Sequence, residues 1–160
     1  TKGLPPIYDG AFFGNSSEAG IDGDVYAYDY ELITLGADAS FNIGDLPLGL
    51  YLDYVQNQDA DDNDQGYIIG SKLGSAKQGS WQLQYQYQEL EADATFALVT
   101  DSDFMGGGTD GKGHKIGAAY ALQSNWTLGF TYFDGEKCFD DIKCEARDYD
   151  RLMVDTKFKY

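Results

Sequence analysis

Long apolar runs are missing from this chain, and basic residues are scarce. No hydrophobic stretch approaches the roughly 18 residues of a membrane-spanning helix, which excludes helical membrane proteins. Lys and Arg number 11 against 27 Asp and Glu, a net charge of −16, which argues against nucleic acid as a partner. Histidine occurs once, as His114, and cysteine twice, as Cys138 and Cys144. We therefore expect no metal site and no cofactor.

Aromatic residues, in contrast, are abundant: the 160 residues include 13 Tyr, 9 Phe and 2 Trp. Disordered acidic chains are poor in aromatic side chains, so this composition indicates a folded chain. The length predicts one domain over residues 1–160.

The dominant pattern is alternation of apolar and polar residues with period two, which predicts strands with one apolar face. Seven segments show it clearly, and residues 7–13 form a weaker eighth candidate. The seven are residues 33–43, 48–54, 67–73, 80–88, 114–122, 125–134 and 151–160. The pattern thus predicts about eight strands. Most of them approach the length of roughly 9–11 residues that a tilted strand needs to cross a bilayer.

The polar face of these strands distinguishes the classes of all-β protein. A soluble sandwich exposes a charged and varied outer face, whereas here Gln, Thr, Ser, Gly and Ala form ordered rows. One strand places Trp81, Leu83, Tyr85 and Tyr87 on one face and Gln82, Gln84, Gln86 and Gln88 on the other. Large apolar residues against a polar row suit a barrel with lipid outside and a polar interior. We expect the four glutamines and Lys157 to face the lumen.

The connections between the segments alternate in length. Those at residues 44–47, 74–79 and 123–124 are short, whereas those at 14–24, 57–66, 92–111 and 135–149 are long. Up-and-down outer-membrane barrels have short periplasmic turns and long outer loops. The sequence therefore predicts an all-β, antiparallel, up-and-down transmembrane β-barrel of about eight strands. Both termini would then lie at the short-turn end.

The chain resembles the bacterial putative porin family of outer-membrane barrels. The likeness is carried by residues 93–104 (DATFALVTDSDF), 106–115 (GGGTDGKGHK) and 116–133, and by residues 32–57. The terminal Tyr160, with apolar residues at alternate positions before it, is similar to the insertion signal of such barrels. Family members are generally much longer than this chain, which resembles the C-terminal half of one or a short relative.

The resemblance implies a non-enzymatic channel in the bacterial outer membrane for passive diffusion of small hydrophilic solutes. An eight-stranded barrel has room only for side chains, while barrels of about 16–18 strands leave an aqueous channel. Conduction therefore requires the remaining half of a larger barrel or association with other copies, with outer-membrane lipid around it. A non-conducting structural or adhesive barrel is the alternative.

Candidate pore residues are Asp101 and Asp103. Residues 92–104 lack a clean strand period, so they either extend a strand beyond the bilayer or fold into the lumen as a constriction loop with these two acids at the narrow point. Fifteen acidic residues gather on the long-loop side and predict a preference for cations. They are Glu18, Asp22, Asp24, Asp59, Asp61, Asp62, Asp64, Asp101, Asp103, Asp110, Asp134, Glu136, Asp140, Asp141 and Glu145.

The sequence gives only weak support for a metal-binding loop or for an enzyme. The acidic stretch at residues 59–64 begins like an EF-hand loop, but Asp64 replaces its glycine and no Glu closes it. A lipid-modifying or proteolytic enzyme would need His114 with a nearby Ser or Asp, and no motif orders such a group. Cys138 and Cys144 are expected to form a local disulfide, because an outer-membrane protein passes through the oxidising periplasm.

Overall fold

The computed structural model describes residues 1–139 and 144–160, and its main feature is one antiparallel sheet. Seven strands follow one another in sequence order across it. They are β3 (Leu32–Ile43), β4 (Leu46–Asn57), β5 (Gln65–Gly74), β6 (Trp81–Leu90), β7 (Gly111–Gln123), β8 (Trp126–Lys137) and β9 (Arg147–Phe158). A short hairpin of β1 (Ser17–Ala19) and β2 (Asp24–Tyr26) and two 3-10 turns, η1 (Ala97–Val99) and η2 (Phe104–Gly106), complete it. The predicted all-β, antiparallel, up-and-down fold is confirmed.

The described segments contain no helix that is long and apolar enough to cross a membrane.

The two faces of the sheet differ in exposure as the alternation predicts. Trp81, Leu83 and Tyr85 are 54%, 49% and 43% exposed, whereas Gln86 and Gln88 on the opposite face are 8% and 7% exposed. We call the face with the tryptophan the outer face and the face with the glutamines the inner face. A slip of one residue in the register would exchange the two faces, so the two-sided pattern specifies the pairing.

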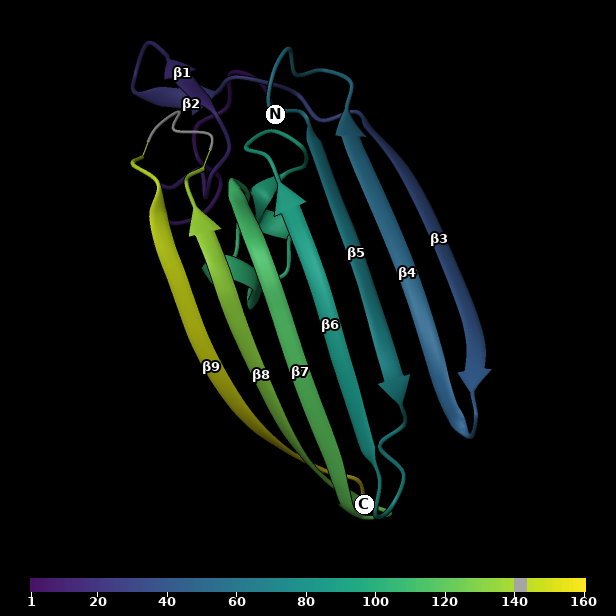
Figure 1. Cartoon of the computed structure of the whole chain (residues 1–160). Helices are drawn as coiled ribbons and strands as arrows, with labels where there is room; N and C mark the ends of the chain where they lie inside the picture. The colour runs from purple at the N-terminus through teal and green to yellow at the C-terminus, as the bar shows by residue number, and fades with distance from the viewer. Residues whose placement is uncertain (140–143) are drawn as a thin grey trace.

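Short and long connections separate at the two ends of the strands (Figure 1). The β3–β4 turn consists of Gly44 and Asp45, and Gly44 has the positive φ of 59° that suits the twist of a tight hairpin. The turns after β5 and β7 lie at the same end, while residues 58–64 and 91–110, the end of β8 and the start of β9 lie at the other (Figure 1). The predicted alternation of loop lengths is therefore present.

The predicted strand over residues 7–13 is wrong. This segment makes only an isolated bridge between Tyr8 and Ala11. Asp9, Gly10 and Phe13 have φ values of 53°, 66° and 53°, and a strand cannot pass through residues in that left-handed region. With seven long strands, the N-terminus lies at the long-loop end and the C-terminus at the short-turn end (Figure 1), so the expectation that both termini share one end is also wrong.

The sheet curves but does not close within the described residues (Figure 1). Strand β3 pairs only with β4, and β9 pairs only with β8, so each has one edge without a partner strand in this part of the chain. The described residues therefore form an open seven-stranded sheet and not the closed barrel of about eight strands that the sequence predicts.

The connection between β6 and β7, which we call the folded-back loop (residues 91–110), lies against the inner face. Its Phe104 and Met105 are buried against Phe133 of β8, with Tyr149 and Met153 of β9 packed beside them. Of the two conformations considered for residues 92–104, the structure shows the one that turns back over the sheet.

Candidate solute path along the inner face

One row of paired residues crosses all seven strands on the inner face, and we call it the central rung. Its members are Asp38, Tyr51, Gly70, Gln86, Lys115, Phe133 and Arg151. The row carries one acid, two bases, an amide and a phenol, so it offers charged and hydrogen-bonding groups across the whole width of the sheet.

Tyr51 organises the glutamines on this face. Its hydroxyl donates a hydrogen bond to Oε1 of Gln86 at 2.9 Å and accepts one from Nε2 of Gln84 at 3.4 Å. Gln86 in turn donates to Oε1 of Gln88 at 3.2 Å. The tyrosine lies across Gly70, where a Cβ would collide with the phenol ring. The missing side chain at Gly70 is therefore what allows a polar ladder to form over three strands.

The folded-back loop brings its two candidate acids to bases of the central rung. Asp101 lies 3.8 Å from Nζ of Lys115, and Asp103 lies 3.3 Å from the guanidinium of Arg151. All four side chains remain partly exposed, so each pair contributes at most about 1 kcal/mol to stability. Sequence reasoning selected the two acids but missed their partners. The signal that was available is that Lys115 interrupts a row of small residues on the inner face of β7, whereas Arg151 lies between Tyr149 and Met153 and has no such mark.

Gln82, Gln84 and Lys157 lie together nearer the short-turn end. With Thr127 and Asp155 they line a hollow of about 150 Å³. Its floor is formed by small residues that include Gly117, Ala119 and Gly129. Gln86 and Gln88 lie closer to the folded-back loop, so the predicted lumen residues span much of the inner face.

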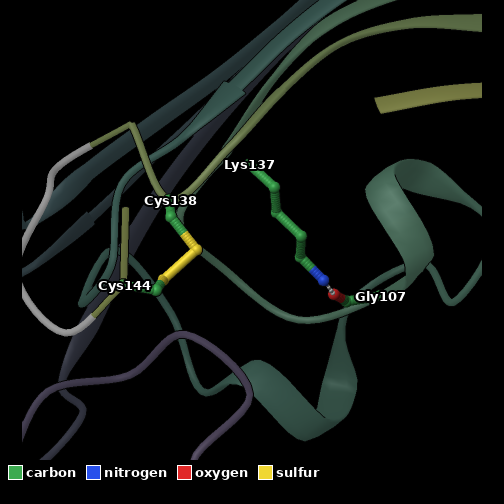
Figure 2. The surroundings of a disulfide bond; sticks show 4 residues. All are labelled: Gly107, Lys137, Cys138 and Cys144. Carbon is green, nitrogen blue, oxygen red and sulfur yellow. Dashed lines mark hydrogen bonds between the residues drawn. A yellow bond between two sulfur atoms is a disulfide. The ribbon is translucent and has the colours of Figure 1, made fainter. Parts of the chain in front are cut away.

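The predicted disulfide between Cys138 and Cys144 is confirmed. Figure 2 shows it beside the folded-back loop, with Lys137 extending from the end of β8 to the loop backbone. Nζ of Lys137 donates to the carbonyl of Gly107 at 2.9 Å, and the amide of Cys138 donates to the carbonyl of Asp110 at 2.8 Å. The last long loop is thus tied to the folded-back loop. Two of the fifteen acids predicted on the long-loop side, Asp140 and Asp141, lie outside the described residues.

The groups considered for metal or enzyme chemistry do not assemble in the part of the chain that is described. Asp110 lies close to both cysteines, but sulfur atoms joined in a disulfide offer no thiolate to a metal. Nδ1 of His114 lies 2.9 Å from the hydroxyl of Tyr85 on the outer face. Asp103 lies over the inner face, so the sheet separates it from the histidine.

Comparison with known proteins gives a family. A family model described as "Putative porin" matches residues 21–160. No curated protein and no solved structure matches the chain. The match covers the hairpin β1–β2 in part and all seven long strands. The chain therefore belongs to the putative porin family, and its general role is porin-like and at the outer membrane.

Proposed function

We propose that the inner face of this sheet lines a water-filled channel through which small hydrophilic solutes cross the outer membrane by passive diffusion, cations in preference to anions. The observation that supports this proposal best is the contrast between the two faces of the sheet. Large apolar side chains are exposed on the outer face, while the glutamine ladder and the central rung lie on the inner face. Lipid requires the first surface and water the second.

The charges at the long-loop end support the preference for cations. The β1–β2 hairpin, which carries Glu18 and Asp22, lies at the long-loop end of the sheet, as do residues 58–64 with their four acids (Figure 1). Carboxylates at a pore mouth with low-dielectric walls raise the local concentration of cations and oppose anions. Lys115 and Arg151 lie deeper in the path, where their positive charges offset part of the negative field of these acids. Each base is itself paired with an acid of the folded-back loop.

Conduction requires a closed wall, and the number of strands restricts how the wall closes. Seven antiparallel strands leave the two edge strands, β3 and β9, running in the same direction. Two copies related by an axis along the membrane normal would therefore bring parallel strands together. A fully antiparallel barrel needs an odd number of additional strands, which favours the remaining half of a larger barrel over a dimer of these seven strands. Barrels of about 16–18 strands are wide enough for water.

The proposal is tested by single-channel recording of the full-length protein in a planar bilayer, followed by the reversal potential across a salt gradient. We expect stepwise conductance and a reversal potential of the sign that cation preference gives. Protein that is inserted and folded, as judged by its β-sheet circular dichroism and resistance to protease, but shows no conductance would contradict the proposal. That result would favour the structural or adhesive barrel.

A further inference from the structure

Three segments distant in sequence meet at the long-loop end around three buried polar side chains. Asn15, Asn57 and Asp93 are 3%, 0% and 1% exposed, and we call them the polar hub. They come from the N-terminal segment (residues 1–31), the end of β4 and the start of the folded-back loop. Burying polar groups is unfavourable unless hydrogen bonds satisfy them. Such a cluster therefore holds the three segments together in one specific arrangement.

Asn15 and Asn57 are well satisfied. Nδ2 of Asn15 donates to the carbonyls of Ala92 and Thr95 at 2.7 and 2.9 Å, and its Oδ1 accepts from the amide of Ala97 at 2.9 Å. Nδ2 of Asn57 donates to the carbonyl of Asp93 at 3.1 Å, and Oδ1 of Asn57 accepts from the backbone of the N-terminal segment. Both amides therefore hold the folded-back loop at its base.

Asp93 is satisfied on one oxygen only. Its Oδ1 accepts hydrogen bonds from the Ser16 amide at 3.0 Å and from the Tyr30 hydroxyl at 3.2 Å. Its Oδ2 is buried and has no hydrogen-bond partner among the described residues. None of the ion pairs found in these residues includes Asp93. A dry carboxylate oxygen without a cation is unfavourable, whereas a proton on that oxygen removes the charge.

We propose that Asp93 is a proton-binding site that locks the N-terminal segment onto the folded-back loop, so that protonation docks the segment and ionisation releases it. The docking itself does not depend on the proposed function. Its consequence for conduction does, because the loop that the segment covers lies over the inner face of the proposed channel.

The surrounding groups support this assignment. Burial raises the pKa of Asp93 above its ordinary value, and hydrogen bonds from Ser16 and Tyr30 only partly oppose that effect. Burial, and then the charge of Asp93, raise the pKa of Tyr30, which therefore stays a hydrogen-bond donor at neutral pH. The charges that act with Asp93 on the neighbouring Tyr28 are all acidic: Asp61, Asp62 and Glu18. The amino group of Thr1, on the same segment, pairs with Asp29.

The direction of the pH effect follows from linkage. A released Asp93 titrates near its ordinary pKa of 3.8, and the docked one titrates higher. Docking is therefore strongest below pH 3.8 and weakens as the pH rises through the docked pKa, above which it stays constant. Each unit by which docking raises the pKa corresponds to about a tenfold change in the docking equilibrium constant.

Hydrogen–deuterium exchange of the full-length protein in lipid nanodiscs tests the lock. Exchange of peptides within residues 12–31 is followed from pH 4 to pH 8 and corrected for the intrinsic pH dependence of amide exchange. We expect protection to fall by about tenfold for each unit of pKa elevation, while peptides of β7 and β8 stay unchanged. Asp93→Asn, which keeps an accepting oxygen and carries no charge, should make protection independent of pH. Asp45→Asn, in the β3–β4 turn at the opposite end of the strands, is the matched control, and its protection should vary with pH as in the wild type.

A second variant tests the proposal even if the N-terminal segment docks poorly in Asp93→Asn. Tyr30→Phe removes a donor to the carboxylate, so the transition should move to higher pH. Protection that does not vary with pH in the wild type, or an unchanged midpoint in Tyr30→Phe, would overturn the lock.

Bilayer recordings separate this proposal from the preceding one. If both hold, acid should lengthen the closed intervals in the wild type but not in Asp93→Asn. Conductance with pH-independent exchange would overturn the lock and leave the channel standing. The expected exchange without conductance would support the lock and contradict the channel.

Discussion

Neutralising both acids of the folded-back loop is the most direct test of the inner face as an ion path. In the variant Asp101→Asn with Asp103→Asn, Lys115 and Arg151 keep their positions but lose the carboxylates that lie 3.8 and 3.3 Å away. Two positive charges then act on every passing ion. We expect cation preference to fall, and to fall more than the loss of two acids elsewhere would produce.

The size of the effect follows from Coulomb's law. A unit charge about 7 Å from a permeating ion contributes about 0.6 kcal/mol in water. Screening at 0.1 M salt, where the Debye length is about 10 Å, reduces this to about 0.3 kcal/mol. Together, two such charges disfavour a cation by about 0.6 kcal/mol and favour an anion by about 0.6 kcal/mol. The cation-to-anion permeability ratio should therefore fall by about eightfold, because a difference of about 1.4 kcal/mol corresponds to a factor of ten.

The assay is the reversal potential across a salt gradient, repeated at high ionic strength. Near 1 M salt the Debye length is about 3 Å, so the effect should shrink to less than about twofold. The control variant, Asp45→Asn with Asp148→Asn, removes the same charge from the short turn and the outer face. Equal permeability ratios in the wild type and the Asp101/Asp103 variant at 0.1 M salt would show that these residues do not border the path. Folding should be retained, because both ion pairs are partly exposed.

Three further variants test the packing that supports this path. Gly70→Ala should lower the free energy of unfolding in urea by about 1–3 kcal/mol, because its methyl group collides with the tyrosine ring, whereas Gly49→Ala, with its nearest neighbour 3.9 Å away, should change it little. Serine at both Cys138 and Cys144 should speed protease cleavage of the last long loop and leave the thermal unfolding of the sheet nearly unchanged, since the disulfide spans six positions within one loop; a large fall in the unfolding temperature would be evidence against a purely local role. Met105→Ala should cost about 2–5 kcal/mol of local packing and loosen the folded-back loop, seen as increased flicker in single-channel records, and quiet records would argue against it.

Most of the sheet could be predicted from the sequence. Successive residues of a strand point to opposite faces, so a strand between two different environments alternates apolar and polar residues. Residues 80–88 alternate apolar residues and glutamine, and that pattern fixed both the strand and its orientation. The same local signal predicted β3, β7 and β8. The loop lengths gave the up-and-down order, because each strand pairs with the next one along the chain.

The remainder depends on contacts between distant residues. Residues 7–13 are only a weaker strand candidate, and left-handed conformations at Asp9 and Phe13 turn the chain there. The partners of the loop acids and the polar hub of Asn15, Asn57 and Asp93 join positions up to 94 residues apart. No spacing along the sequence marks such pairings, since Asn and Asp occur throughout the loops.

The strictly sequential pairing of the strands also has a consequence for how the protein is assembled. Every ladder of the main sheet joins strands that are neighbours in the chain, so the sheet can grow by adding one hairpin at a time. Each addition closes only a short stretch of chain, and contacts of that kind form early and fast. In the proposed channel wall, the pairings that join the free edges of β3 and β9 to further strands would span a longer stretch of chain. Growth of the sheet can thus proceed as a series of local steps, and we expect closure of the proposed channel wall to be slower, with the open edges exposed to incorrect partners until it occurs.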